Sequence, residues 1–255
     1  MSWNIASGLD GKGVLVTGAA GGIGREVVLA FAKAGTRGCA VDLKQDAVDK
    51  VVAECEGGPH RAVGFDLRKI SEMPKLLADT RNAFGRLDVI ACVAGVLIRR
   101  NSVDEVTEAD WDFQHEVNLK STFFLNQAAG KIFREQGRGG RIINFTSQGW
   151  WTGGFGGSVA YAASKGGIVS LTRGLARSYA KDRITVNAVS PGAADTSMLR
   201  SGLTEEQLNA QISQIPIGYM AAPSELAGTV LFLASDHAGY ITGATINVSG
   251  GWLMY

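Results

Sequence analysis

The stretch Thr17-Gly18-Ala19-Ala20-Gly21-Gly22-Ile23-Gly24 follows the apolar run Val14 to Thr17 and precedes a segment with helical apolar periodicity. This order predicts a glycine-rich turn that joins a strand to a helix. The free N–H groups and the dipole at a helix N-terminus favour an anion, and glycine lets that anion approach the backbone. We therefore expect a pyrophosphate at Gly18, Gly21, Gly22, Ile23 and Gly24, although a glycine string alone also serves simple tight turns.

The second apolar run ends at Asp42, 18 residues beyond Gly24. A carboxylate at this distance can bind the two hydroxyls of an adenosine ribose, and it repels a 2′-phosphate. Leu43 follows the acid, and the only basic residues nearby are Lys44 and Arg25. These residues predict NAD(H) as the cofactor, in preference to NADP(H), with Asp42 and Leu43 at the adenosine ribose.

Beyond the turn, short apolar runs alternate with helical patterns along the whole chain, which is typical of a parallel sheet covered on both faces. We expect one domain, residues 1–255, with a Rossmann-type doubly wound α/β fold and about seven strands. The expected strands are Val14 to Thr17, Gly38 to Val41, Ala62 to Phe65, Val89 to Val93, Arg141 to Phe145, Thr185 to Val189 and Thr245 to Val248. The expected helices are Gly22 to Ala34, Gln45 to Glu54, Ser71 to Phe84, Glu108 to Gln136, Val159 to Ala180 and Pro223 to Ala234.

Composition excludes several classes of protein. The 255 residues include 34 glycines and only 5 prolines, 45% are hydrophobic, and no Gly-X-Y period is present, so neither collagen nor a disordered chain fits. The 25 basic and 24 acidic residues form no long run of one sign, which argues against nucleic acid or a membrane as partner. The N-terminus lacks a leader pattern, so we expect a cytoplasmic protein. Three isolated cysteines and three scattered histidines predict no metal site.

Tyr161 and Lys165 stand four residues apart in a helical pattern, which places them on one face. A free tyrosine has a pKa near 10, and a neighbouring ammonium would lower it, so that Tyr161 could exchange a proton near neutral pH. Ser147 ends a strand pattern at the carboxyl edge of the expected sheet, where open α/β folds bind ligands. Asn118 lies in a helical stretch and either faces solvent or points inward to hold a water.

These residues and motifs, TGAAGGIG, Asp42, Asn118, Ser147, Tyr161 and Lys165 in this order, resemble the short-chain dehydrogenase/reductase family over essentially the whole chain. The resemblance implies that Tyr161 is the general acid/base, that Ser147 orients the substrate oxygen and that Lys165 lowers the tyrosine pKa and holds the nicotinamide ribose. It implies that Asn118 positions a relay water. It also implies a homodimer or homotetramer packed through helices, and further cofactor contacts at Asp66, Leu67, Ala94, Gly95, Pro191, Gly192 and Thr196.

The chain departs from the family pattern at three places. Cys92-Val93-Ala94-Gly95 replaces the usual Asn-Asn-Ala-Gly, and Ser249-Gly250-Gly251 replaces Asp-Gly-Gly. Ser147 precedes Tyr161 by 14 residues instead of the more frequent 13, and Gln148 occupies the 13-residue position. We favour Ser147 as the source of the hydroxyl, because a glycine-rich loop absorbs one extra residue at little cost in free energy.

The substrate pocket is less clearly marked in the sequence. Aromatic residues Trp150, Trp151 and Phe155 follow Ser147 and either wall an apolar pocket or pack within their own loop. Residues 193–220, with Met198, read as one or two short helices that form a mobile lid over the site. Arg99 and Arg100 could reach a carboxylate or phosphate, although paired surface arginines are more common.

The leading hypothesis is therefore an NAD(H)-dependent oxidoreductase that interconverts a small-molecule secondary alcohol and a ketone, with Tyr161 handling the hydroxyl proton and no metal. An NADPH-dependent 3-oxoacyl-thioester reductase is the nearer alternative, against which Asp42 argues. A noncatalytic NAD-binding regulator is the alternative from another class, and the intact Tyr161, Lys165 and Ser147 argue against it.

Overall fold

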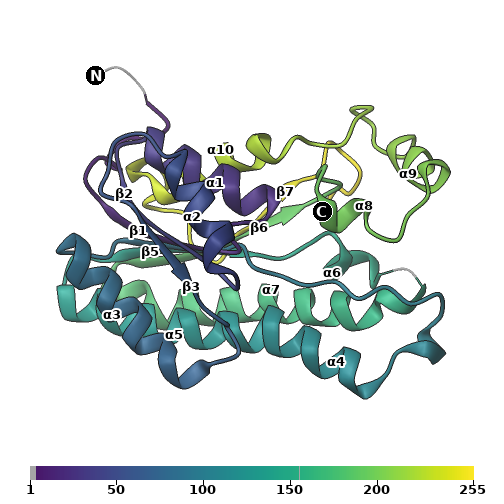
Figure 1. The fold of residues 1–255 in the computed structure, drawn as a ribbon, viewed down its shortest axis with the longest axis horizontal. Helices are drawn as coiled ribbons and strands as arrows, with labels where there is room; N and C mark the ends of the chain where they lie inside the picture. Colours follow the sequence, from purple (N-terminus) through teal and green to yellow (C-terminus); the bar gives the residue numbers. More distant parts are fainter. Residues whose placement is uncertain (1–3, 155) are drawn as a thin grey trace.

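The computed structural model describes residues 4–154 and 156–255, and it has a seven-stranded parallel sheet at its centre (Figure 1). The strand order is β3-β2-β1-β4-β5-β6-β7. This confirms the predicted doubly wound α/β fold, and the predicted strand ends agree with the observed ones within one or two residues. The strands are β1 (Gly13–Thr17), β2 (Arg37–Asp42), β3 (Arg61–Gly64), β4 (Val89–Cys92), β5 (Gly140–Phe145), β6 (Ile184–Pro191) and β7 (Thr245–Val248).

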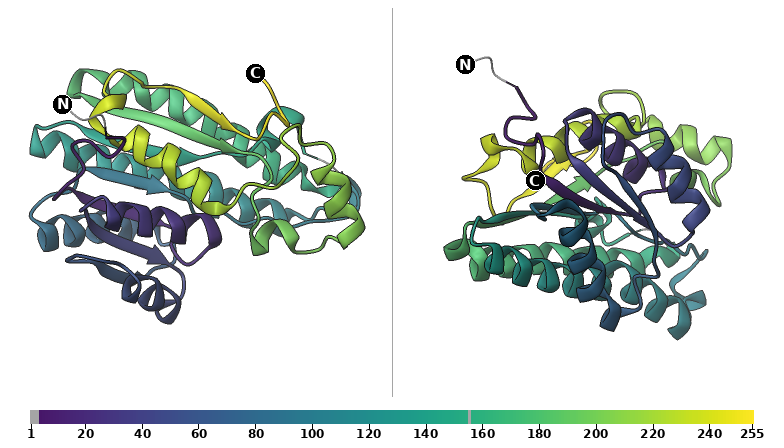
Figure 2. Two further views of the ribbon diagram at one scale, coloured as in Figure 1. Left: turned by 90° about the horizontal axis from the view of Figure 1, so that it is seen from above. Right: turned by 60° about the vertical axis from the view of Figure 1, so that its left-hand side comes forward.

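Helices cover both faces of the sheet (Figures 1 and 2). One face carries α1 (Gly22–Lys33), α2 (Gln45–Ala53) and α10 (Pro223–Ala234), and the other carries α3 (Met73–Phe84), α4 (Glu108–His115), α5 (Ser121–Gln136) and α7 (Val159–Tyr179). Each layer encloses its own apolar core, with Val27 and Phe31 of α1 in the first and Phe133 of α5 in the second. Parallel strands are joined by right-handed crossovers, and the helices of these crossovers form both layers. None of the helices in the described ranges is long and apolar enough to cross a membrane.

The long helix expected from Glu108 to Gln136 is interrupted in the structure. A π-helical turn, Glu116–Lys120, separates α4 from α5 and carries Asn118. Turns of this kind insert one residue into a helix and are frequent at functional sites. The apolar pattern continues through the insertion, which explains why the sequence predicted one uninterrupted helix.

Two regions beside the carboxyl ends of the strands complete the fold. The loop after β5, expected to be irregular, contains the short helix α6 (Gly149–Thr152). The segment between β6 and α10 forms α8 (Ser197–Arg200) and α9 (Glu205–Ile212), in agreement with the expected short helices at residues 193–220. Figure 2 shows this segment projecting beyond the end of the sheet. Because β1 and β4 are neighbours while their helices go to opposite faces, a crevice opens at this edge.

Candidate active site

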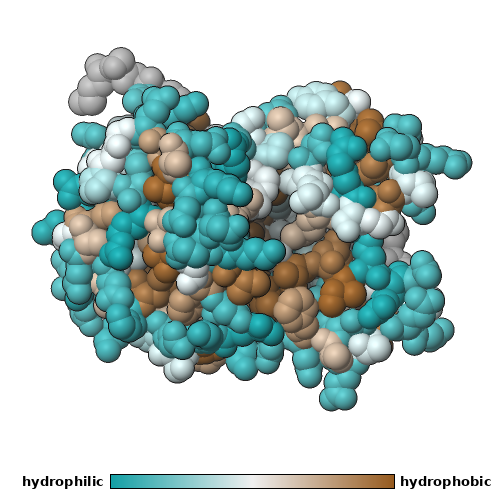
Figure 3. Space-filling view, viewed as in Figure 1, coloured by the Kyte–Doolittle hydropathy of each residue, from teal (hydrophilic) through white to brown (hydrophobic). Residues whose placement is uncertain are grey.

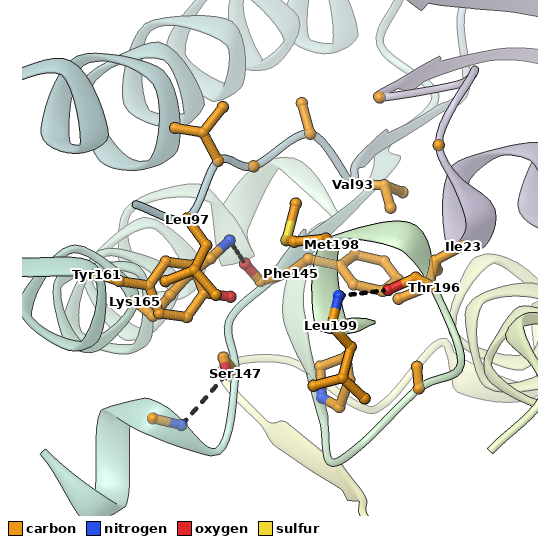
Figure 4. Close-up of a pocket in the computed structure, with 18 of the residues that line it drawn as sticks. Ile23, Val93, Leu97, Phe145, Ser147, Tyr161, Lys165, Thr196, Met198 and Leu199 are labelled. Carbon is orange, nitrogen blue, oxygen red and sulfur yellow. Dashed lines mark hydrogen bonds between the residues drawn. The ribbon is translucent and has the colours of Figure 1, made fainter. Parts of the chain in front are cut away.

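A cavity of about 790 Å³ occupies the crevice. In Figure 3, apolar residues gather around the hollow on this face of the molecule. The cavity reaches from Asp42 at the end of β2, past the glycine-rich turn, to Tyr161 on α7. Figure 4 shows Tyr161 and Lys165 on one side of it, Ile23 and Thr196 on the other, and Met198 between them. Nearly all of the predicted site residues therefore meet in one place.

The glycines of the turn after β1 have different structural roles. Gly18 has a φ of +68°, and a Cβ on Gly24 would lie 1.9 Å from the carbonyl oxygen of Gly18, so both shape the turn itself. A Cβ on Gly22 would lie 2.9 Å from Cγ2 of Thr196, so Gly22 lets the segment after β6 approach. Helix α1 begins at this turn with Gly21 as its N-cap and has no side-chain cap. Its first N–H groups therefore face the cavity without a protein acceptor from a capping side chain, as a phosphate site requires.

Asp42 lies directly beside the glycine turn. Its carboxylate accepts hydrogen bonds from the main-chain N–H of Ala20 at 2.9 Å and of Leu43 at 2.7 Å. Arg25, one of the two cations that could neutralise a 2′-phosphate, instead contacts Glu26 and Glu54. Lys44 is exposed at the N-cap of α2. The acid predicted to discriminate against a 2′-phosphate thus lies beside the glycine turn, and Arg25 is bound to two glutamates.

Asp66 and Leu67 follow β3 and line the same end of the cavity. The guanidinium of Arg68 binds the Asp66 carboxylate at 2.6 Å and lowers its pKa, mainly through the side-chain hydrogen bond. Arg68 also lies over the ring of Phe113, 5.6 Å from the centroid. The pair fixes the orientation of Asp66 at the place where the resemblance expects an adenine.

Tyr161 and Lys165 project from the first turns of α7, as their spacing predicted (Figure 4). Burial raises the pKa of Tyr161, while a hydrogen bond with Ser147 and the charge of Arg99 oppose that rise. The Lys165 ammonium donates a hydrogen bond to the carbonyl of Phe145 at 2.9 Å and lies 5.7 Å from the Tyr161 ring centroid. Arg99 is thus a second cation close to Tyr161, and the effect of Lys165 on the pKa of Tyr161 stays a prediction.

Ser147 and Gln148 could both have supplied the polar group beside Tyr161. The Ser147 hydroxyl interacts with the Tyr161 hydroxyl and accepts a hydrogen bond from the Gly149 N–H at 3.2 Å. Helix α6 starts at Gly149, directly after Ser147 and Gln148. Gln148 also lines the cavity, and among the described residues its buried Oε1 has no hydrogen-bond donor. The geometry therefore supports Ser147 as the source of the hydroxyl beside Tyr161. It also reveals the buried Oε1 of Gln148 as an unexpected hydrogen-bond acceptor.

Asn118 points inward from the π-helical turn and is fully buried. Its Oδ1 accepts from the Val96 N–H at 2.8 Å, and its Nδ2 donates to the Val96 carbonyl at 3.0 Å and to the Ser164 hydroxyl at 3.1 Å. The side chain thus fixes the backbone that follows Ala94 and Gly95. Its role in positioning a water stays a prediction, since the side-chain donors are used within the protein.

The departure from Asn-Asn-Ala-Gly has a clear structural context. Burial raises the pKa of the Cys92 thiol to about 12, and the thiol donates to the Asn126 side chain at 3.3 Å. A Cβ on Gly95 would lie only 3.2 Å from the Lys165 ammonium. Cys92 is therefore a neutral core residue, and Gly95 leaves space for the lysine.

The loop after β6 passes close to the second unusual segment, Ser249-Gly250-Gly251. A Cβ on Gly192 would lie 2.7 Å from Cα of Ser249, and the Pro191 carbonyl accepts from the Gln148 N–H at 3.1 Å. Thr196 caps α8 by accepting from the Leu199 N–H at 3.2 Å (Figure 4). Pro191, Gly192 and Thr196 all line the cavity, at the end opposite Asp66.

The aromatic loop differs from the sequence expectation. Trp150 and Trp151 do not line the cavity, and both pack on Tyr255, with ring centroids 4.9 Å and 5.5 Å away. Their indoles turn toward Tyr255 because the apolar C-terminal segment lies next to α6. Trp252, in the same segment, does line the cavity. Phe155 lies outside the described residues. Met198 lines the cavity as expected.

Arg99, left open by the sequence, is part of the site. It lines the cavity and donates to three main-chain carbonyls at the end of α8. Arg100 instead forms a two-pronged pair with Asp110, at 2.9 Å and 2.8 Å. The sequence could not reveal this role of Arg99, because an arginine that binds backbone carbonyls needs no particular residue type as its partner.

Comparisons with known proteins agree with this geometry. A family profile described as Enoyl-(Acyl carrier protein) reductase matches residues 18–253. The chain is 39% identical over 251 residues to 2-dehydro-3-deoxy-D-gluconate 5-dehydrogenase of Escherichia coli (strain K12), covering 97% of this chain and 98% of that protein. It is 37% identical over 248 residues to D-threitol dehydrogenase of Mycolicibacterium smegmatis, covering 96% and 94%. A crystal structure of a short-chain type dehydrogenase/reductase from Mycobacterium marinum superposes with a TM-score of 0.91 at 30% identity, covering 98% of both chains.

Proposed function

The chain belongs to the short-chain dehydrogenase/reductase family, and we propose that it uses NAD(H), with Tyr161 as the general acid/base. It is an oxidoreductase that acts on CH–OH groups and interconverts secondary alcohols and ketones. The observation that carries the proposal is the cavity that joins the uncapped start of α1 and Asp42 to the Tyr161 hydroxyl.

The residues fit a dinucleotide. Gly18, Gly22 and Gly24 keep side chains away from the first turn of α1, whose N–H groups would hold the pyrophosphate. Asp42 would accept hydrogen bonds from the adenosine ribose, and Lys165 would bind the ribose at the nicotinamide end. The nicotinamide, when bound, exchanges a hydride with the carbon that carries the substrate oxygen.

The remaining chemistry belongs to this chain. The Ser147 hydroxyl lies beside the Tyr161 hydroxyl, so that the two can hold one substrate oxygen between them. Because burial raises the pKa of Tyr161, the protonated phenol is its favoured form at neutral pH. In ketone reduction that phenol donates its proton to the developing alkoxide, and in alcohol oxidation the phenolate takes the hydroxyl proton. Arg99 and Ser147 favour the phenolate and so support the second direction.

The preference for NAD(H) rests on Asp42 and on the binding of Arg25 to two glutamates. A 2′-phosphate placed beside the Asp42 carboxylate would meet like charge, with Lys44 as the remaining basic residue nearby. We expect kcat/KM to be higher with NAD(H) than with NADP(H) by a factor of at least about ten, one such repulsion being worth about 1.4 kcal/mol or more. A preference for NADPH would favour the rival 3-oxoacyl-thioester reductase, the activity named for a relative from Thermotoga maritima that is 36% identical over 250 residues.

The role of Tyr161 is tested by Tyr161→Phe, which removes the hydroxyl and keeps the ring. Turnover is expected to fall by about 100-fold or more, as the loss of a general acid/base does, while NADH binding, followed by fluorescence titration, changes little. Near-normal turnover would refute the assigned role. Wild-type protein that binds NADH and turns over no alcohol or ketone would instead support the noncatalytic regulator. A cytoplasmic location and a homodimer or homotetramer are part of the proposal, and sedimentation velocity tests the assembly.

A further inference from the structure

Four cationic side chains line the cavity, and three of them have a clear partner or task. Arg68 pairs with Asp66, and Arg100 pairs with Asp110. Lys165 binds the Phe145 carbonyl next to Tyr161. The fourth is Arg99, which forms no ion pair with any carboxylate in the part of the chain that the structure describes. Its positive charge is therefore not neutralised by the protein.

The hydrogen bonds of Arg99 hold it in a defined position. Nη1 donates to the carbonyls of Met198 at 3.1 Å and Ser201 at 2.9 Å, and Nη2 donates to the Leu199 carbonyl at 3.3 Å. These acceptors are neutral, and they occupy three of the five N–H groups of a guanidinium. The donors that remain are on Nε and on Nη2, one edge of the guanidinium, which is the edge that can bind a carboxylate through two parallel bonds.

The location of Arg99 places this charge beside the reacting centre. Arg99 lines the cavity together with Tyr161, Met198 and Leu199, and its charge acts on the Tyr161 hydroxyl. The Arg99 side chain is partly buried, and this burial lowers the pKa of its guanidinium. A cation held in an apolar cavity without a counter-ion is unfavourable, and an anionic ligand relieves that cost.

We propose that Arg99 binds a carboxylate of the substrate, so that this enzyme interconverts a hydroxy acid and the corresponding oxo acid. The inference rests on the proposed function and narrows its substrate class. One unpaired positive charge matches one singly charged carboxylate better than a phosphate dianion, which would need further donors. Because Arg99 also binds the end of α8, we expect the substrate carboxylate to bind next to this helix.

The test compares acids with neutral analogues of the same shape. 3-Hydroxybutyrate and gluconate, and the amide of each, are assayed with saturating NAD⁺ using wild type, Arg99→Gln and Arg99→Lys. Wild type is expected to prefer the acids, and Arg99→Gln to lose about 10- to 100-fold in kcat/KM for acids, the usual effect of removing one charged hydrogen-bonded pair. The amides should change by less than about threefold, and Arg99→Lys should recover part of the preference. Arg200→Gln is the matched control, because Arg200 lies on α8, the helix that Arg99 binds, and already pairs with Asp195.

Three results would overturn the inference. An equal loss for acids and amides in Arg99→Gln would mean that Arg99 serves only to hold α8, and a wild-type preference for the amides or for phosphate esters would exclude the carboxylate. Titration of the NADH complex with 3-hydroxybutyrate and gluconate, followed by NADH fluorescence, decides the case without turnover: acid binding in wild type that Arg99→Gln abolishes supports the inference. If neither acid binds while neutral alcohols are oxidised in a Tyr161-dependent reaction, the inference fails and the proposed function stands.

Discussion

The ammonium of Lys165 donates a hydrogen bond to the carbonyl oxygen of Phe145 at 2.9 Å, which joins α7 to the last residue of β5 within the core of the site. Lys165 is buried, with 3% of its surface exposed, and burial lowers its pKa to about 8 from the usual value near 10.5. Ser147 follows two residues after Phe145. The hydrogen bond therefore holds the lysine close to the strand end that carries Ser147, and it keeps the ammonium in a poorly solvated position.

The buried charge gives a pH dependence of known sign. Between pH 8 and 10.5, Lys165 binds fewer protons in the folded protein than in the unfolded chain. The contribution of Lys165 to the free energy of unfolding therefore rises with pH in this window and is constant below pH 8. Relative to Lys165→Met, which cannot titrate, wild type should gain up to about 3 kcal/mol from pH 7 to pH 10. Urea unfolding at the two pH values measures it, with the exposed Lys181→Met as control for the loss of a lysine. A constant difference between wild type and Lys165→Met would show that the charge is not destabilising.

A second prediction concerns the glycine turn. A Cβ at Gly24 would lie 1.9 Å from a backbone oxygen, whereas the nearest atom to a Cβ at Gly21 lies 3.4 Å away. Gly24→Ala should therefore lower the free energy of unfolding by about 1–3 kcal/mol or more through overpacking, and Gly21→Ala by less than about 1 kcal/mol. Chemical denaturation checks both variants. Equal stability of the two would mean that the turn opens easily, and that Gly24 is needed only for ligand approach.

Most of the fold could be predicted because alternating strand and helix patterns are properties of local sequence. The seven strands, and the glycine turn with Asp42 at the switch point, follow from apolar periodicity and spacing alone. The π-helical turn at Asn118 could not be predicted, because one inserted residue leaves the apolar pattern on either side intact. Tyr161 and Lys165 could be paired because one helix carries both.

The contacts that sequence reasoning missed join segments that lie far apart in the chain. Arg99 binds carbonyls about 100 residues further along, and main-chain carbonyls leave no sequence signal. Trp150 and Trp151 were expected at the substrate pocket because they follow Ser147, yet Tyr255, over 100 residues later, provides the surface on which they pack. Aromatic residues that follow Ser147 in the sequence therefore did not identify the pocket wall in this protein.

A third prediction uses the buried amide of Gln148. Its Oε1 has no donor among the described residues, so replacing the amide with an apolar group of similar size removes an uncompensated polar atom. Gln148→Leu is expected to leave the free energy of unfolding unchanged or raise it by up to about 1 kcal/mol. The matched control is Gln114→Leu, because the Gln114 Oε1 accepts from the Ile98 N–H at 3.0 Å, and its loss should cost about 1–3 kcal/mol. A comparable loss in both variants would show that Gln148 makes a stabilising hydrogen bond.

The last prediction concerns the C-terminal residue, which closes the aromatic cluster formed with α6. The Trp150 indole N–H donates to the Tyr255 hydroxyl at 3.3 Å, and the Trp151 ring stacks on the tyrosine at an interplanar angle of 28°. Tyr255→Ala removes both contacts and exposes the indoles, so tryptophan emission should shift to longer wavelength and the free energy of unfolding should fall by about 1 kcal/mol.

Tyr240→Ala is the control for Tyr255→Ala, because the Tyr240 side chain is fully exposed and its removal should change neither the emission nor the stability. Since α6 lies between Ser147 and Tyr161 in the chain, loss of the cluster should also loosen Ser147, which we propose holds the substrate oxygen. We therefore expect Tyr255→Ala to lower kcat by a fewfold, while NADH affinity, which we propose depends on the glycine turn, stays the same. Unchanged emission in Tyr255→Ala would mean that the C-terminus does not pack on α6 in solution. The predicted effect on Ser147 and on kcat would then be wrong as well.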